Sequence, residues 1–212
     1  LGSTQMIAAF KRSYQFEHVF KSAFCIGLLP MLYAPALPLV LIVPVTLVLY
    51  RRTLREAVVA AAGLLLPFFI CSVVWWGLGD SFGLMGHELL AGTTLGEDTA
   101  LPAFFGEKGV WSKVYIGLFA ALTLCSAIII LRTLSSLRTR AKKIHIHFLW
   151  LLLLCLISLL LPGNTIASLG VLAVPCCVTV SAFFIRYRGW LPLAIYTVLT
   201  ALMLYINLFP GV

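Results

Sequence analysis

Charged side chains are scarce in this sequence. Only 10% of its 212 residues are Asp, Glu, Lys or Arg, against roughly 25% in an average soluble domain. Hydrophobic residues make up 62% of the chain, which is more apolar surface than a soluble fold of this size can cover. The composition therefore excludes an ordinary water-soluble protein and predicts that lipid surrounds most of the chain.

A strict alternation of polar and apolar residues, which would indicate barrel strands, is missing as well. Residues 148–161 (FLWLLLLCLISLLL) are apolar on every side, whereas every second residue of a barrel strand faces the polar interior. Inside hydrocarbon, a helix satisfies all of its backbone hydrogen bonds within its own segment. The expected fold class is all-α: a polytopic transmembrane helical bundle.

Ionisable residues are absent from the middle of the apolar segments, and the common catalytic motifs are absent from the whole chain. Ion-coupled pumps and carboxylate-based intramembrane proteases need ionisable groups at mid-membrane, so both classes are disfavoured. No GxSxG, Walker A or GxGxxG motif occurs, and the six cysteines lack CxxC spacing. His145 and His147 are two residues apart and cannot share one helix face, so we expect interfacial packing for them. The sequence predicts no cofactor and no metal site.

Proline and arginine divide the hydrophobic sequence into segments that can cross a membrane. Residues 22–50 carry no charge but contain four prolines, so they form either one long tilted helix or two helices that turn at Ala34-Pro35. Residues 60–63 (AAAG) are small and allow a second helix to approach closely. The remaining apolar segments are 57–77, 112–131, 144–161, 166–185 and 190–208.

The distribution of Lys and Arg decides between six and seven helices. If residues 22–50 form two helices, thirteen of the fifteen basic residues fall on one side of the membrane; one helix gives ten against five. Because basic residues accumulate on the cytoplasmic side, the sequence predicts seven helices, with six as the alternative, a cytoplasmic N-terminus and an external C-terminus. The predicted topology-determining residues are Arg51, Arg52, Arg55, Arg132, Arg138, Arg140, Lys142, Lys143, Arg186 and Arg188.

The same topology defines the domain organisation. Residues 1–5 (LGSTQ) are interpreted as a tag remnant, and residues 6–212 as a single transmembrane helical domain with one long extracytoplasmic loop at 78–111. Glu97 and Asp98 in this loop are the candidate catalytic residues or divalent-cation ligands. The alternative interpretation is that a loop depleted of positive charge is acidic only for solubility.

Several short motifs follow one another along the chain: YAP at 33–35, RRTLRE at 51–56, GLLLP at 63–67, a basic segment at 137–143, and AVP at 173–175. With these motifs the chain resembles a family of uncharacterised polytopic integral membrane proteins of Bacteroidota, grouped as a domain of unknown function. The resemblance covers most of the chain from about Glu17 and implies the bacterial inner (cytoplasmic) membrane. Members are longer at the N-terminus, which implies a short member or a fragment. The family has no known activity, so no functional residues carry over.

These features lead to two functional hypotheses. The first is an integral inner-membrane protein that is a non-enzymatic binding, transport or envelope-assembly component. The alternative is a membrane enzyme that acts on a lipid-linked substrate at the outer face through the acidic loop 78–111. The net charge of +8 lies beside apolar segments, so the expected partners are membrane lipids rather than nucleic acid. A second copy of the chain or an envelope protein is a further expected partner, and the ligand is left open.

Overall fold

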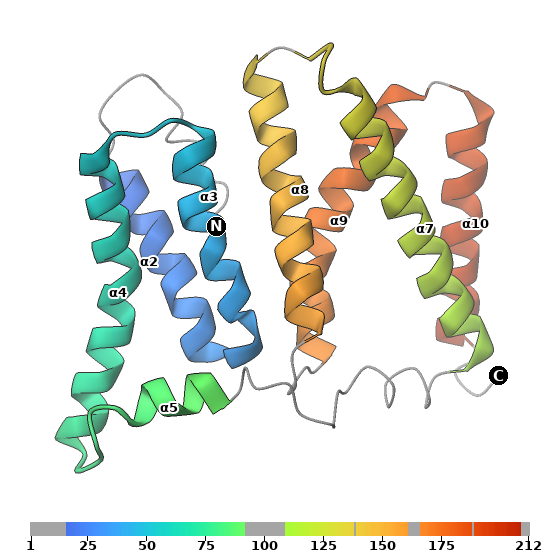
Figure 1. Ribbon diagram of the computed structural model, residues 1–212. Helices are drawn as coiled ribbons and strands as arrows, with labels where there is room; N and C mark the ends of the chain where they lie inside the picture. The colour runs from blue at the N-terminus through green and yellow to red at the C-terminus, as the bar shows by residue number, and fades with distance from the viewer. Residues whose placement is uncertain (1–15, 92–108, 138, 161–165, 188, 209–212) are drawn as a thin grey trace.

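The computed structural model describes residues 16–91, 109–137, 139–160, 166–187 and 189–208, and every regular element within these ranges is a helix (Figure 1). This confirms the all-α fold class. In chain order the helices are α2 (Phe16–Leu32), the 3₁₀ helix η1 (Ala34–Leu41), α3 (Ile42–Leu49), α4 (Leu54–Gly77), α5 (Leu84–Ala91), α7 (Val110–Thr133), α8 (Thr139–Leu159), α9 (Ile166–Arg186) and α10 (Trp190–Leu208).

Residues 22–50 lie in two antiparallel helical segments, α2 and the continuous pair η1–α3, as the charge distribution predicted (Figure 1). α2 ends at Leu32, and Tyr33 has an extended backbone, with φ −152° and ψ 97°. Pro35 and Pro38 have no amide hydrogen to continue an α-helix, but proline is tolerated in the first turn of a new helix. A new helix, η1, therefore begins at Ala34 and continues directly into α3. The alternative of one helix over this segment is not observed.

Three of the described helices are long and apolar enough to cross a membrane. They are α4, α7 and the part of α8 from Ala141 to Leu159. The apolar stretches 34–49, 170–186 and 192–206 are shorter. α5 lies across the lower end of the molecule in Figure 1, inside the segment expected to be the extracytoplasmic loop.

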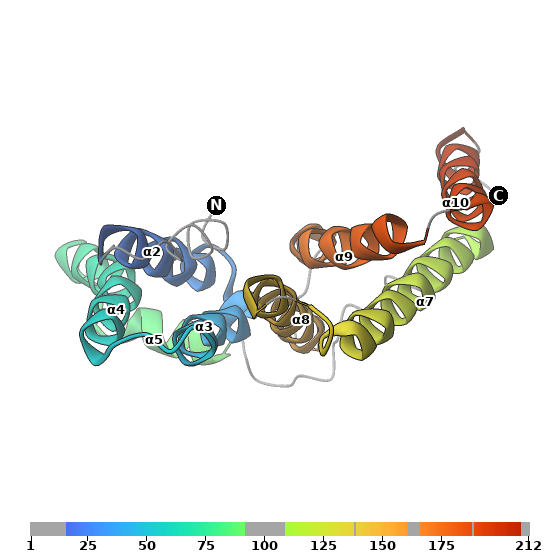
Figure 2. The same ribbon diagram turned by 90° about the horizontal axis from the view of Figure 1, so that it is seen from above.

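The helices stand side by side in an elongated row, which Figure 2 shows from above. α2, η1–α3 and α4 form an N-terminal group, and α7, α8, α9 and α10 form a C-terminal group. α8 joins the groups because it packs against both η1 and α3, a contact that we name the α8 seam. There Leu154 and Cys155 share one buried cluster with Ile42 and Val43.

Glycines allow α2 and α4 to pack closely. A Cβ atom added at Gly63 would lie 2.9 Å from the Phe20 carbonyl oxygen, and one added at Gly27 would lie 2.7 Å from the Leu64 carbonyl oxygen. The two backbones touch because neither glycine has a side chain. Within the predicted small-residue surface, Ala60 and Gly63 are buried and face α2, while the other two alanines are exposed.

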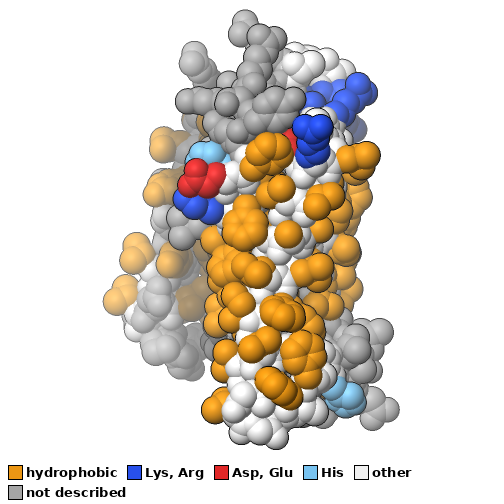
Figure 3. Space-filling model, turned by 90° about the vertical axis from the view of Figure 1, so that its left-hand side faces the viewer, with side chains coloured by type: hydrophobic (Ala, Val, Ile, Leu, Met, Phe, Trp, Pro, Cys, Tyr) orange, Lys and Arg blue, Asp and Glu red, His pale blue; other side chains and the backbone are white. Residues whose placement is uncertain are grey.

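Large apolar side chains cover the outer faces of the row. Figure 3 shows this for the side formed by α4, where hydrophobic residues extend along the helix and Lys and Arg lie only toward one end. Leu65 is 64% exposed and Phe69 is 57% exposed. Moving one such side chain from water to an apolar environment is favourable by about 2 kcal/mol. The row therefore has the surface of a protein surrounded by lipid, in keeping with its three membrane-length helices.

Candidate functional site

The helix ends that carry most of the described Lys and Arg residues lie together at one end of the row, at the top of Figure 1, and we name this end the basic end. α3, α7 and α9 end there, and α4 and α8 begin there. Lys113, near the start of α7, lies at the opposite end. Arg138, Arg188 and the side chain of Arg140 fall outside the described residues. Of the residues predicted to determine topology, the structure describes seven at the basic end: Arg51, Arg52, Arg55, Arg132, Lys142, Lys143 and Arg186.

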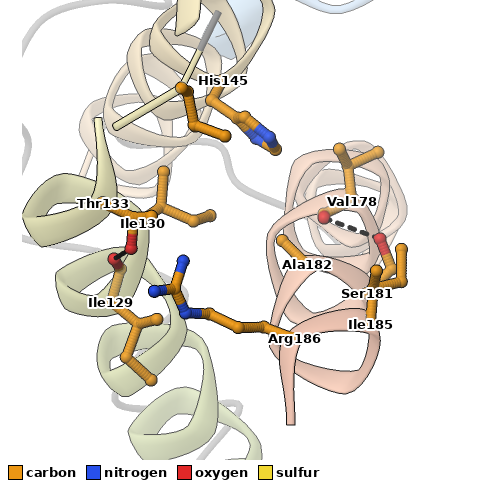
Figure 4. A pocket seen from close by; sticks show the side chains of 10 residues that line it. Ile129, Ile130, Thr133, His145, Val178, Ser181, Ala182, Ile185 and Arg186 are labelled. Carbon is orange, nitrogen blue, oxygen red and sulfur yellow. Dashed lines mark hydrogen bonds between the residues drawn. The ribbon is translucent and has the colours of Figure 1, made fainter. Parts of the chain in front are cut away.

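A pocket of about 300 Å³ lies at the basic end between α7, α8 and α9 (Figure 4). This volume is at the lower end of the range for small-molecule sites. Arg186 reaches across from α9 toward α7, and the ring of His145 points into the same space from α8. The pocket thus has nitrogen-containing side chains from two helices.

Helical spacing explains which side chains line the pocket. On α9 the lining residues Val178, Ser181, Ala182, Ile185 and Arg186 recur at intervals of three and four, so they share one face. The same rule brings Ile129, Ile130 and Thr133 together on α7. Each helix therefore contributes one face, and apolar residues predominate on both.

The two hydroxyl groups in the pocket are already used as donors. Thr133 Oγ1 donates to the Ile129 carbonyl oxygen at 2.5 Å, and Ser181 Oγ donates to the Val178 carbonyl oxygen at 2.8 Å. A hydroxyl has only one hydrogen to donate. The donors that remain for a ligand are therefore the guanidinium of Arg186 and the imidazole of His145.

No carboxylate lies near these donors on the helices that form the pocket. α7, α8 and α9 contain no Asp or Glu, and the sequence has none after Glu107. The described ion pairs are both in the N-terminal part: Lys21 with Glu17 at 2.5 Å, and Arg52 with Glu56 at 3.0 Å. The positive charge of the pocket is therefore not balanced by the helices that build it.

Other cations at the basic end do contact the protein itself. Arg52 pairs with the buried Glu56, which also closes the capping box of α4 with Thr53. Lys143 lies over the ring of Tyr50, with its Nζ atom 5.7 Å from the ring centroid. Burial raises the pKa of the Tyr50 phenol above its ordinary value. Arg186 differs from these residues because its side chain faces a cavity.

A second polar contact lies at the α8 seam. His147 is fully buried, and its Nδ1 atom is 3.4 Å from the Thr46 Oγ1 atom of α3. Its Nε2 atom has no hydrogen-bond partner among the described residues. His145 and His147 face different neighbours, as their spacing predicted. Because its side chain is fully buried against α3, we treat His147 as a packing residue.

The sequence predicted the candidate catalytic residues in a different region, the acidic loop 78–111. Glu97 and Asp98 lie outside the described residues. Arg186 was predicted only to determine topology, and His145 only to pack at the interface. Their convergence was missed, although one signal was available: the sequence has no Asp or Glu after Glu107, so no acidic residue near Arg186 in the sequence can pair with it.

The chemistry that the site supports is binding. Among the described residues, no group of three or more His, Cys, Asp or Glu side chains is arranged to hold a metal ion. The pocket itself contains donors and apolar walls, and none of its lining residues is acidic or a cysteine. Comparisons with protein-family models, curated proteins and solved structures give no match to this chain.

Proposed function

We propose that this chain is a multi-pass integral protein of the bacterial inner membrane that binds a ligand in the pocket between α7, α8 and α9. In this proposal it is a non-enzymatic component for binding, transport or envelope assembly. The observation that carries the proposal is the pocket of Arg186 and His145, formed by helices without a single acidic residue. A site of this kind attracts an anion and contains no carboxylate that would repel it.

The membrane placement is supported by the exposure of the long apolar helices. In the most apolar stretches of α4 and α7, 22% of the residues are buried within the protein, and in α8 33% are buried. Most side chains on these helices therefore contact the surroundings. In lipid this costs nothing, because acyl chains are as apolar as the side chains themselves.

The orientation is supported by the basic end. Cytoplasmic ends of membrane helices collect Lys and Arg, so we place the basic end and the pocket in the cytoplasm-facing half of the membrane. The alternative function, an outer-face enzyme, depends on Glu97 and Asp98, and no observation on the described residues favours it.

Membrane topology is tested by single-cysteine labelling of spheroplasts. Ser81→Cys and Ser136→Cys are introduced separately after the six native cysteines are replaced by alanine. Ser81 is in the bend between α4 and α5, and Ser136 follows α7 at the basic end. We expect a membrane-impermeant maleimide to label position 81 from outside and position 136 only after lysis. Equal labelling of both positions from one side would overturn the multi-pass arrangement.

Ligand binding is tested by filling the pocket. Ala182→Phe places a ring in the cavity while it retains Arg186, and Ala61→Phe adds the same ring to the exposed face of α4. Native mass spectrometry of the purified protein should show a co-purified small molecule on the wild type and on Ala61→Phe. The adduct should be lost from Ala182→Phe. An identical spectrum for all three proteins would remove the pocket as the functional site.

A further inference from the structure

We infer that the pocket between α7, α8 and α9 binds a phosphate group, with the Arg186 guanidinium and the His145 imidazole as its hydrogen-bond donors (Figure 4). Two sources can supply this group at the basic end: the head group of a phospholipid, or free phosphate in solution. This inference rests on the proposed function, because it names the chemical class of the ligand for the same pocket.

The charge of the pocket calls for an external anion. Arg186 stays protonated at any physiological pH, and no carboxylate on α7, α8 or α9 is present to balance it. The described acids at this end of the molecule, Glu17 and Glu56, form ion pairs with Lys21 and Arg52 of the N-terminal group. The Arg186 side chain lines the pocket but is exposed to the surroundings, and an anion that enters beside it is attracted by its positive charge.

The donors fit the geometry of phosphate. The planar guanidinium presents parallel N–H groups that bind two oxygens of a phosphate at once. The imidazole comes from a different helix and points into the same space, so it can meet a third oxygen. Thr133 and Ser181 donate to their own helices and do not compete for this role. A tetrahedral anion is therefore held from two sides, by α8 and α9.

The walls of the pocket fit the remainder of a lipid. Below the polar groups the lining is apolar, with Ile129, Ile130, Val178 and Ile185. The faces of α7 and α9 beyond the pocket are also apolar, with Ile128 and Val174 exposed. Phospholipid phosphates are concentrated at the depth where membrane helices end. A phosphate in the pocket would thus have acyl chains that continue along the helices.

The test uses the purified, delipidated full chain in detergent and native mass spectrometry. Two probes with the same oleoyl chains are compared: phosphatidylglycerol, which has a phosphate, and dioleoylglycerol, which has none. We expect the wild type to retain phosphatidylglycerol and to lose dioleoylglycerol. Arg186→Gln should weaken phosphatidylglycerol retention by about tenfold, since hydrogen bonds to a charged group are lost. Equal retention of both probes by the wild type would overturn the inference.

Matched variants separate recognition from general charge and from folding. Arg132→Gln removes a cation from the same end that does not line the pocket, and it should retain phosphatidylglycerol as the wild type does. Arg186→Lys preserves the positive charge needed for insertion but lacks the parallel N–H groups of the guanidinium. Its retention of phosphatidylglycerol should therefore lie between those of the wild type and Arg186→Gln. If Arg186→Gln fails to insert, Arg186→Lys and Ala182→Phe decide the question. Wild-type retention in both would contradict the inference.

The source of the phosphate is identified by competition. Inorganic phosphate at millimolar concentration is added to the complex with phosphatidylglycerol. Displacement supports recognition of a free phosphate, and persistence of the complex supports recognition of a lipid head group. Failure of the inference differs from failure of the proposed function. If the molecule that Ala182→Phe loses contains no phosphate, the proposed binding function stands and only the inference that the ligand is a phosphate is overturned.

Discussion

The N-terminal and C-terminal groups of helices differ in how their charges are balanced. In the N-terminal group, Arg52 pairs with the buried Glu56, and the Lys21 ammonium that hydrogen-bonds Glu17 lowers the pKa of that carboxyl. In the C-terminal group, acids are absent and Arg186 faces a cavity. Both described ion pairs therefore lie in the N-terminal group, although Arg51 and Arg55 of that group have none among them. In the proposed function, the C-terminal group keeps Arg186 for a ligand.

The two groups also differ in packing. α2 and α4 touch backbone to backbone at Gly27 and Gly63, whereas α7 and α9 leave a cavity between them at the basic end. Close contact of long helices contributes many dispersion interactions. The N-terminal group should therefore be the more sensitive of the two to added volume, and the C-terminal group the more tolerant.

Enlarging a glycine gives the largest expected difference between the groups. Gly63→Leu forces a side chain against the Phe20 carbonyl oxygen and the Ala23 side chain, and it should lower the free energy of unfolding by about 3 kcal/mol. Gly117→Leu on α7 is the control, because a Cβ there meets no atom within 4 Å. Denaturant titration in detergent micelles measures both. Equal destabilisation would show that the tight contact of α2 with α4 is not specific.

Neutralising one charge in each group gives the next largest effect. Glu56→Gln leaves Arg52 without its carboxylate and weakens the capping box, so it should cost about 2 kcal/mol of unfolding free energy. Arg186→Gln removes a charge that has no carboxylate on its helices. In ligand-free protein it should change stability by less than about 0.5 kcal/mol. The same titration checks both variants. An equal loss of unfolding free energy in Arg186→Gln and Glu56→Gln would contradict the difference in charge balance between the two groups.

A hydrogen bond between helices tests the cohesion of the C-terminal group. The buried Ser126 Oγ on α7 donates to the Thr179 carbonyl oxygen on α9 at 2.7 Å. Ser126→Ala should therefore cost about 1 kcal/mol. Ser181→Ala provides the comparison, because the Ser181 hydroxyl bonds only its own helix. If both variants unfold at the same denaturant concentration, the bond between α7 and α9 contributes nothing to this group.

The sequence predicted where the helices lie better than how they meet. The last segment was expected at 190–208, which is the extent of α10. The distribution of Lys and Arg along the whole chain also correctly favoured two helices over one for residues 22–50. In a soluble protein an apolar stripe marks the face that packs. Helices in lipid are apolar on both faces, so that signal is lost. For the contact of α2 with α4, the sequence indicated only that residues 60–63 allow a close approach, and it did not identify the helix that approaches. The convergence of Thr133, His145 and Arg186 depends on three helices that no local pattern brings together.

The smallest expected effect concerns the α8 seam, where the two groups meet. His147 is fully buried, its Nε2 atom has no partner among the described residues, and its Nδ1 contact with Thr46 is long, at 3.4 Å. Thr46 already donates to the Ile42 carbonyl oxygen, so it does not depend on the imidazole. His147→Leu should therefore leave the unfolding free energy unchanged or raise it by about 0.5 kcal/mol, because a desolvated ring nitrogen is removed.

Thr46→Val is the matched control for this seam, because it removes the other partner of the same contact and keeps a branched side chain. Both variants should unfold within about 0.5 kcal/mol of the wild type, since Leu154 and Cys155 pack against Ile42 and Val43 independently of them. A loss of more than about 1 kcal/mol in His147→Leu alone would show that a polar bond holds the groups together. The N-terminal and C-terminal groups would then be coupled through His147 rather than joined by apolar packing.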